Sequence, residues 1–403
     1  MKNKKLLLSL VALLSCASAS HAQLSGPDAY MKGNYIEIGV SGIGGFEGAD
    51  SITIPAGMNY RSNQPYFGFV ANPQMDSWTN YDGDFFTPGS PENGWGFEIG
   101  TTGTTSGGDL AANNCSILNQ IPGAITSWSY TAGQILCDWE GDATSGADLH
   151  FKINYQLQDN DLFYITTVTV TNNTTSTIPE MYYYRNLDPD NNIMLSGDYT
   201  TQNTIVSQAS SSSYAQVSAT QALPWSSYFA FVTQTADTNW RASYGGFSNR
   251  DPSDEWNGIG FTQTVGATNF ADEAITISYR IQNLAPNDSA TFKFCSVFDG
   301  AAVTSALTGM ETSYSSINNT TMSNVVSVFP NPFTDVTTIK IGKDVKLINA
   351  EIHFYDIAGK EVKVLSVSST EIQIDRKGLA DGMYFYKLIN KGEAISTGKL
   401  TIK

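Results

Sequence analysis

An all-β fold is predicted for this chain by its many strand-like runs and by the scarcity of helical patterns. Runs rich in Val, Ile, Tyr and Phe alternate with clusters of Gly, Asn, Asp and Pro along the 403 residues. No amphipathic helical stretch of useful length separates them. We therefore expect a large antiparallel β-sandwich as the body of the protein, followed by a small seven-stranded β-sandwich of immunoglobulin-like form.

The first 22 residues are predicted to be a secretory signal peptide, because lysines precede an apolar run at 6–14 and small residues follow it. Cleavage after Ala22 would leave Gln23 at the mature N-terminus. The alternative is a lipobox that makes Cys16 a lipidated anchor, but Leu14 fits that pattern poorly. No other run approaches the roughly eighteen apolar residues of a membrane span.

The body is predicted over residues 23–300 as one large β domain, and residues 301–324 as a short helical or coil segment that ends in a polar linker. Turn-forming residues separate its strand-like runs, which fall at 34–42, 150–158, 161–172, 181–188, 228–235, 274–283 and 290–298.

Acidic residues are concentrated in the body. The formal net charge of the chain is −16, to which residues 23–324 contribute −21 and residues 325–403 contribute +2. Such a body repels nucleic acid and anionic membranes, so both are excluded as partners. Acidity at this density suits solubility outside the cell or the binding of hard cations.

Three cysteines follow the predicted signal. In an oxidising compartment Cys115 and Cys137 could form a disulfide worth about 3 kcal/mol through loop-closure entropy. Separate buried thiols are the alternative. Cys295 lies in an alternating run and is predicted to be a core thiol.

Two oxygen-rich segments are candidates for metal binding. Asp188, Asp190 and Asn192 place oxygen-bearing side chains at alternate positions, as calcium-binding loops do. A plain turn stabilised by asparagine and aspartate side chains explains the same residues, and calcium is therefore one of two open interpretations. The second segment contains Asp251, Asp254 and Glu255 beside Trp256, and it has the same ambiguity.

All seven tryptophans fall in the body. Most are expected to fill the space between two sheets. Trp78, Trp95 and Trp256 lie in segments rich in Gly, Asp and Asn, so we expect them to be exposed and to stack on sugar rings.

No catalytic constellation stands out. His150 is the single histidine of the body, and one imidazole cannot serve as both acid and base. A GxSxG nucleophile motif is absent. Glycoside hydrolysis by two carboxylates stays open, because six acids lie near tryptophans in the sequence: Asp82, Asp84, Glu92, Glu98, Asp138 and Glu140.

The C-terminal stretch 325–403 contains seven short strand-like runs with turn residues between them. Four landmarks occur in order: PNPF at 330–333, DIAGK at 356–360, GMYFYK at 382–387 and a basic terminal strand. The residues of these motifs that we single out are Pro330, Asn331, Pro332, Asp356, Gly359, Lys360, Gly382 and Tyr384. The prolines should hold the first strand short, and the glycines should allow turns of positive φ.

These landmarks resemble the C-terminal sorting domain of cargo of the Bacteroidetes type IX secretion system. The resemblance implies export through the periplasm, recognition by the type IX translocon at the outer membrane, and removal of the domain by a sortase-like peptidase.

The body more weakly resembles galactose-mutarotase-like supersandwich domains of uncharacterised exported proteins. The segment 159–192 looks like the central hairpin of that fold, and the segment 274–298 looks like its closing hairpin. The resemblance bears on fold more than on activity.

Three functions are compatible with these observations. The preferred one is a non-catalytic module on the cell surface, or released from it, that binds glycan or another extracellular ligand. The alternatives are a carbohydrate-active enzyme with paired carboxylates and a structural surface component.

Overall fold

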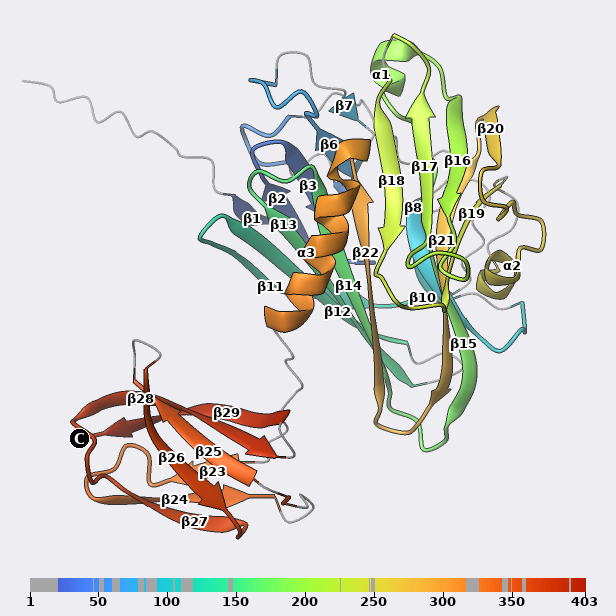
Figure 1. Ribbon diagram of the computed structural model, residues 1–403. Helices are drawn as coiled ribbons and strands as arrows, with labels where there is room; N and C mark the ends of the chain where they lie inside the picture. Colours follow the sequence, from blue (N-terminus) through green and yellow to red (C-terminus); the bar gives the residue numbers. More distant parts are fainter. Residues whose placement is uncertain are drawn as a thin grey trace, which may run out of the picture. The chain divides into compact units, whose positions relative to one another are not determined.

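The computed structural model describes most of the chain after residue 20. The described residues are 21–45, 47–50, 54–59, 66–78, 83–84, 93–103, 106–109, 119–143, 148–224, 226–245, 247, 251–316, 326–342, 347–348, 350–356, 360–390 and 393–403. They form two compact units, Met1–Ser313 and Tyr314–Lys403, which we call the body and the C-terminal unit. The helices and strands of both units are labelled in Figure 1.

Two large sheets build the body (Figure 1). The larger has nine strands in the order β11 (Gly123–Thr131), β12 (Gln134–Ala143), β13 (Leu149–Gln158), β14 (Phe163–Asn172), β22 (Ser289–Val297), β18 (Tyr228–Thr233), β17 (Gln216–Gln221), β16 (Thr201–Ser207) and β20 (Thr268–Ala271). The smaller has six strands in the order β10 (Asn119–Gln120), β9 (Ser106–Asp109), β8 (Asn93–Ile99), β15 (Ile178–Leu187), β21 (Ala274–Leu284) and β19 (Trp240–Gly245). Their neighbouring strands are antiparallel except for β9 and β10.

Smaller elements complete the body. A five-stranded sheet contains β1 (Ala22–Ser25), β2 (Asp28–Lys32), β3 (Ile36–Val40), β6 (Phe69–Ala71) and β7 (Gly83–Asp84), and a two-stranded one contains β4 (Ala49–Asp50) and β5 (Tyr66–Phe67). The helical elements are α1 (Ile193–Ser196), α2 (Pro252–Asn257), the 3-10 turn η2 (Gly300–Ala302) and α3 (Val303–Ser316). The all-β sandwich predicted from the strand-like runs is confirmed.

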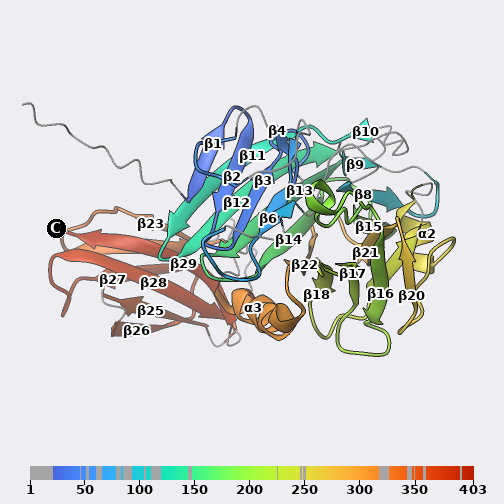
Figure 2. The same cartoon turned by 90° about the horizontal axis from the view of Figure 1, so that it is seen from above.

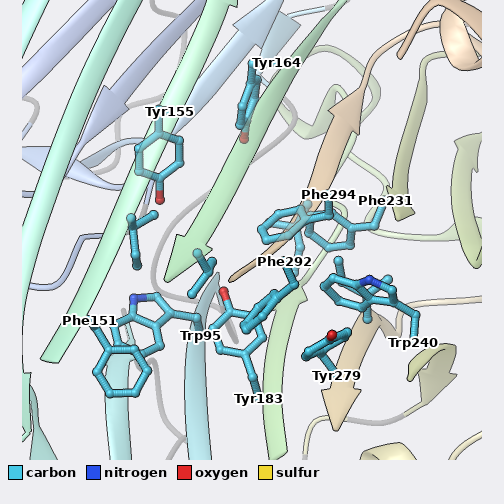
Figure 3. Close-up of a cluster of buried hydrophobic side chains, with 14 of the residues drawn as sticks. Trp95, Phe151, Tyr155, Tyr164, Tyr183, Phe231, Trp240, Tyr279, Phe292 and Phe294 are labelled. Carbon is cyan, nitrogen blue, oxygen red and sulfur yellow. The ribbon is translucent and has the colours of Figure 1, made fainter. Parts of the chain in front are cut away.

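Strand alternation places an aromatic core between the two large sheets. Along β12, Ile135, Cys137 and Trp139 point inward and are fully buried, while the residues between them face outward. Figure 3 shows the aromatic part of this core, where rings from both sheets interlock. Tyr279 and Phe292, for example, come from different sheets and stack with ring centroids 4.3 Å apart.

Both hairpins predicted for the body are wrong. β14 pairs with β13 and β22, whereas β15 pairs with β8 and β21, so the turn between β14 and β15 crosses from one sheet to the other. β21 and β22 are likewise divided between the sheets. The two crossings lie side by side, because β14 pairs with β22 and β15 pairs with β21. Alternating strands on either side of a polar turn are compatible with a hairpin and with such a crossing, which is why the pattern alone misled.

Helix α3 covers part of the outer face of the nine-stranded sheet (Figures 1 and 2). Its Ala306 and Met310 are buried against Phe163, Ile165 and Cys295 of β14 and β22. The Cys295 thiol faces the Ala306 carbonyl oxygen at 3.8 Å, so this cysteine is a core thiol, as predicted.

The C-terminal unit is a separate sandwich of seven strands, as predicted. One sheet contains β23 (Val326–Phe329), β24 (Val336–Ile341) and β27 (Glu371–Asp375), and the other contains β26 (Glu361–Val367), β25 (Ala350–Tyr355), β28 (Gly382–Asn390) and β29 (Glu393–Ile402). Its own apolar core includes Ile339, Ile352, Phe354, Leu388 and Leu400.

The sequence landmarks of the C-terminal unit lie at its turns. β23 ends at Phe329, directly before Pro330, and the Asn331 side chain then accepts from the Thr401 amide at 2.8 Å and donates to the Lys399 carbonyl at 3.0 Å. The Asp356 carboxylate accepts from the Lys360 amide at 3.0 Å. Gly359 lies outside the described residues.

The remaining landmark residues lie at the start of β28. Gly382 adopts φ +150°, a backbone conformation that suits glycine, and it opens the strand. The Tyr384 hydroxyl donates to the Ala380 carbonyl at 3.0 Å, which closes the turn before β28.

Candidate ligand face of the six-stranded sheet

The exposure predicted for Trp95 and Trp256 is wrong. Trp95 lies in β8 and is 1% exposed; its indole N–H donates to the Gly44 carbonyl at 2.9 Å, and its ring stacks on Tyr183 with centroids 5.9 Å apart. Flanking glycines made this segment look like a loop, but Trp95 and Phe97 alternate as buried strand residues do. Trp256 lies in α2 and is 9% exposed.

The other described tryptophans divide between surface and core. Trp78 is half-buried, and its indole N–H donates to the Asn34 carbonyl at 2.8 Å. Trp128, expected in the core, is 44% exposed, because it lies on β11 at the edge of the nine-stranded sheet. Trp139 and Trp240 are fully buried, as expected.

The outer face of the six-stranded sheet, turned away from the main core, is polar. Asn186 of β15 pairs with Thr276 of β21, which in turn pairs with Ser243 of β19, and Ser278 lies two residues further along β21. We call Asn186, Thr276, Ser243 and Ser278 the polar row. Their neighbours in sequence belong to the main core, so alternation directs the polar row to the opposite face.

Three members of the polar row carry unpaired groups although they are fully buried. Both amide atoms of Asn186 and the hydroxyls of Ser243 and Ser278 have no hydrogen-bond partner. Buried polar groups in folded proteins are nearly always paired. A polar molecule that reached this row would gain hydrogen bonds, but the residues that cover the row would have to move to admit it, because its members are 0–1% exposed.

Helix α2 lies along the same face and carries Trp256. The guanidinium groups of Arg241 and Arg280 stack on the Trp256 ring, at 4.4 Å and 4.0 Å from its centroid. The indole N–H donates to the Asn239 carbonyl at 2.7 Å. Trp256 is thus fixed between two cationic groups, which adds aromatic and basic character beside the polar row.

Two carboxyl groups hold the start of α2. Asp251 caps the helix by accepting from the Ser253 and Asp254 amides, and Glu98 of β8 accepts from the Ser253 and Gly103 amides. Burial, and then the hydrogen bond shared with Asp251, raises the pKa of Glu98. Burial acts to raise the pKa of Asp251 as well, but hydrogen bonds from Glu98 and Ser253 outweigh it and lower that pKa. Of the two hydrogen-bonded carboxyl groups, Glu98 therefore keeps its proton to the higher pH.

Of the six acids named as candidates for a carboxylate pair, Asp138 and Glu140 lie together, because one ammonium group contacts both. Asp138 and Glu140 lie on the outer face of the nine-stranded sheet, where both are 3.2 Å from the Lys152 ammonium group. His150 lies on that face too, with Nδ1 2.8 Å from Asp142. Glu98 is on the other sheet. Asp82 and Glu92 lie outside the described residues, as does the side chain of Asp84.

The predicted metal ligands are in part brought together. Carboxylate oxygens of Asp188 and Asp190 lie close to one another and to Asp272, which the sequence pattern did not indicate. Asn192 is buried at the N-cap of α1, with φ 60° and no capping hydrogen bond from its side chain. Asp272 was missed because it is remote in the sequence and reaches the group through the pairing of β15 with β21.

Other predicted residues are placed only in part. Cys137 is fully buried in β12, and burial raises the pKa of its thiol. Cys115 and Cys16 lie outside the described residues, so the disulfide and the lipid anchor stay predictions. Ala22 opens β1 and pairs with Met31, and cleavage between Ala22 and Gln23 also stays a prediction. In the part of the chain described here, no helix is long and apolar enough to cross a membrane.

Solved structures similar to this chain include sugar-acting proteins at low similarity. Heparan sulfate lyase HepC from Pedobacter heparinus matches with TM-score 0.36 and 7% identity over 87% of this chain and 43% of its own. A putative aldose 1-epimerase from Escherichia coli K12 matches with TM-score 0.31 and 11% identity, over 67% of this chain and 98% of its own.

A galactose mutarotase-like protein from Clostridium acetobutylicum matches with TM-score 0.29 and 10% identity, over 68% of this chain and 95% of its own. The chain spans less than half of the polysaccharide lyases that it matches. No curated protein matches the chain.

The fold defines a class: an all-β protein with a large acidic body and a small, separately folded C-terminal sandwich. Residues 327–403 match the family model described as the secretion system C-terminal sorting domain. The chain is accordingly cargo of type IX secretion, and its destination is the cell surface or the extracellular space.

Proposed function

We propose that the body of this exported protein is a non-catalytic module that binds an extracellular glycan on the outer face of the six-stranded sheet. The observation that carries the proposal is the polar row, in which Asn186, Ser243 and Ser278 are buried and unpaired. Each such group costs about 1–3 kcal/mol when it is left without a partner. A ligand that supplies hydroxyls would recover part of this cost.

The chemistry of the row suits a sugar. Serine hydroxyls donate and accept, and the Asn186 amide does both at separate atoms, as adjacent sugar hydroxyls require. Trp256 and the guanidinium of Arg280, whose Nε–H is unpaired, lie beside the row. Arg280 would also accept a carboxylate or sulfate substituent, which extends the proposal to acidic glycans.

Hydrolysis is supported less well. Glycosidases place two carboxyl groups roughly 5 to 10 Å apart on either side of the scissile bond. On this face Glu98 and Asp251 are hydrogen-bonded to each other and to the first amides of helix α2, so they are engaged in holding the helix. A carbohydrate-active enzyme and a structural surface component are therefore the alternatives, and they predict sugar turnover and self-association respectively.

The test is a glycan array with the exported chain, followed by calorimetry on any ligand found. Ser243→Ala and Ser278→Ala should weaken binding at least tenfold. Because they remove unpaired buried hydroxyls, they should leave the melting temperature unchanged or raise it. Ser289→Ala, on the outer face of the nine-stranded sheet, is the matched control and should bind as the natural chain does. Array signals at background, or unchanged binding by both variants, would refute the proposal.

A further inference from the structure

Three carboxylates meet at the end of β15 that leads into α1. One oxygen from each of Asp188, Asp190 and Asp272 lies within 4.8 Å of the others. Asp188 directly follows β15, Asp190 precedes α1, and Asp272 lies between β20 and β21. Asp188 is 3% exposed and Asp190 is 1% exposed, whereas Asp272 is on the surface. The group is therefore closed toward the protein and open to solvent on one side.

The backbone holds the two buried acids in place without using their carboxylates. The Asp190 amide donates to the Asp188 carbonyl at 3.0 Å, and the Ile193 amide donates to the Asp190 carbonyl at 3.2 Å. Asn191, fully buried, donates from its side chain to the Ala219 and Ser227 carbonyls, both at 3.1 Å. The turn is thus fixed to neighbouring segments, and the carboxylate oxygens stay free to bind something else.

The carboxylates of this group lack partners. Oδ1 of Asp188 and both oxygens of Asp190 are buried and accept no hydrogen bond. Burial, followed by the charges of Asp190 and Asp272, raises the pKa of Asp188, and burial with Asp272 raises the pKa of Asp190 to about 8. A bound cation would neutralise the charge and fill the oxygens' coordination.

The geometry selects among cations. Hard carboxylate oxygens favour Ca²⁺ and Mg²⁺ over softer metals. Ligands on opposite sides of Ca²⁺ lie up to about 5 Å apart, since each is about 2.5 Å from the ion, whereas around Mg²⁺ the limit is about 4.2 Å. The three oxygens lie within 4.8 Å of one another, which is compatible with either ion, and Ca²⁺ is preferred because it accepts irregular coordination whereas Mg²⁺ requires near-ideal octahedral geometry. Asn192, in the same turn, has a buried side-chain oxygen without a partner and is the next donor in the chain.

We propose that Asp188, Asp190 and Asp272 bind a calcium ion that ties the turn before α1 to the turn between β20 and β21. The ion joins segments that are far apart in the sequence and lie at the end of β15, the strand that carries Asn186 of the polar row. The site does not depend on glycan binding, so it stands or falls independently of the proposed function.

Calcium titration of the full exported chain, after removal of divalent ions with EGTA, tests the site. Calorimetry should show one calcium bound per chain, with at least tenfold weaker binding of Mg²⁺, and the melting temperature should rise with calcium until the site saturates. Asp190→Asn should abolish this response. In the absence of calcium the same variant should melt at the same temperature or higher, because a buried charge has been removed.

Two further variants complete the experiment. Asp272→Asn, a change near the surface, should reduce calcium affinity at least tenfold, and Asp148→Asn, an exposed acid away from the site, should bind calcium as the natural chain does. No heat and no thermal shift at millimolar calcium would overturn the proposal. An undiminished response in both Asp190→Asn and Asp272→Asn would overturn it too, since the ion would then bind elsewhere.

Discussion

The guanidinium of Arg185 donates to the carboxylate of Glu47 at 2.6 Å inside the body, where the two side chains are 2% and 0% exposed. The Tyr164 hydroxyl donates to the other Glu47 oxygen at 2.5 Å, and Arg185 also donates to the Gly94 carbonyl at 3.2 Å. The ion pair connects β15 of the six-stranded sheet, through Glu47, to β14 of the nine-stranded one. A buried pair satisfied in this way is stable as a unit and costly to break.

Replacing one partner should therefore destabilise the body strongly. Glu47→Ala leaves the Arg185 charge buried and unpaired, so the free energy of unfolding should fall by about 3–5 kcal/mol. Urea unfolding, monitored by tryptophan fluorescence, measures this change in the free energy of unfolding. A double replacement by apolar residues, Glu47→Leu with Arg185→Met, should recover much of the loss. A loss below 1 kcal/mol for Glu47→Ala would show that the pair is not formed.

Two of the tryptophans whose exposure differs from expectation, one buried and one exposed, give a matched comparison. Trp95→Ala should lower the free energy of unfolding by about 3–5 kcal/mol, because a fully buried ring is removed from a close-packed core. Trp128→Ala, on the surface of β11, should change it by no more than about 0.5 kcal/mol. The pair is compared by chemical denaturation under identical conditions. Equal effects of the two substitutions would contradict the burial described here.

Stability should depend on pH through Glu98. The pKa of Glu98 in the folded protein is raised above the ordinary 4.5. Its contribution to the free energy of unfolding is therefore fully present below pH 4.5 and is lost as pH rises through the folded pKa. Glu98→Gln, which mimics the protonated acid, should remove this decline. The pKa of Asp251 is lowered below the ordinary 3.8, so its contribution to the free energy of unfolding is lost only in acid, as pH falls below 3.8. Melting temperatures from pH 3 to 8 test both limbs, and an unchanged profile in Glu98→Gln would reject the assignment.

Helix α3 should stabilise the body even though it lies near its C-terminal end. Met310→Ala removes a side chain that is 2% exposed, so the free energy of unfolding of the body should fall by about 2–5 kcal/mol. Thr304→Ala is the control, because Thr304 is exposed on the same helix. Hydrogen exchange at β14 and β22 should quicken in the first variant only. Equal protection in both would mean that the helix is not docked.

The strands of greatest regularity could be predicted from the sequence. Several runs of the C-terminal unit alternate apolar and polar residues, and all are rich in Val, Ile, Tyr and Phe between turn-forming residues, so its seven strands were found. In the body, β13 and β22 were found for the same reason. β16 and β17 were missed because they are rich in Gln, Ser and Thr, which fit strands and loops alike.

The sites were harder to predict because they depend on pairing between remote segments. Asp188 and Asp190 stood out by their spacing, but Asp272 joins them only through the register of β15 with β21. The polar row is spread over β15, β19 and β21, so no local motif marks it. Trp95 was misplaced because flanking glycines suggested a loop, whereas those glycines are strand residues on the opposite face.

The central claim is that the C-terminal unit is an address and that the body folds and binds without it. Removal of residues 317–403 tests this most directly, because the cut preserves α3. In a host with type IX secretion, the truncated chain should stay inside the cell, while its purified body keeps the melting temperature measured for the body in the full chain. Undiminished delivery of the truncated chain to the surface or medium would contradict the account.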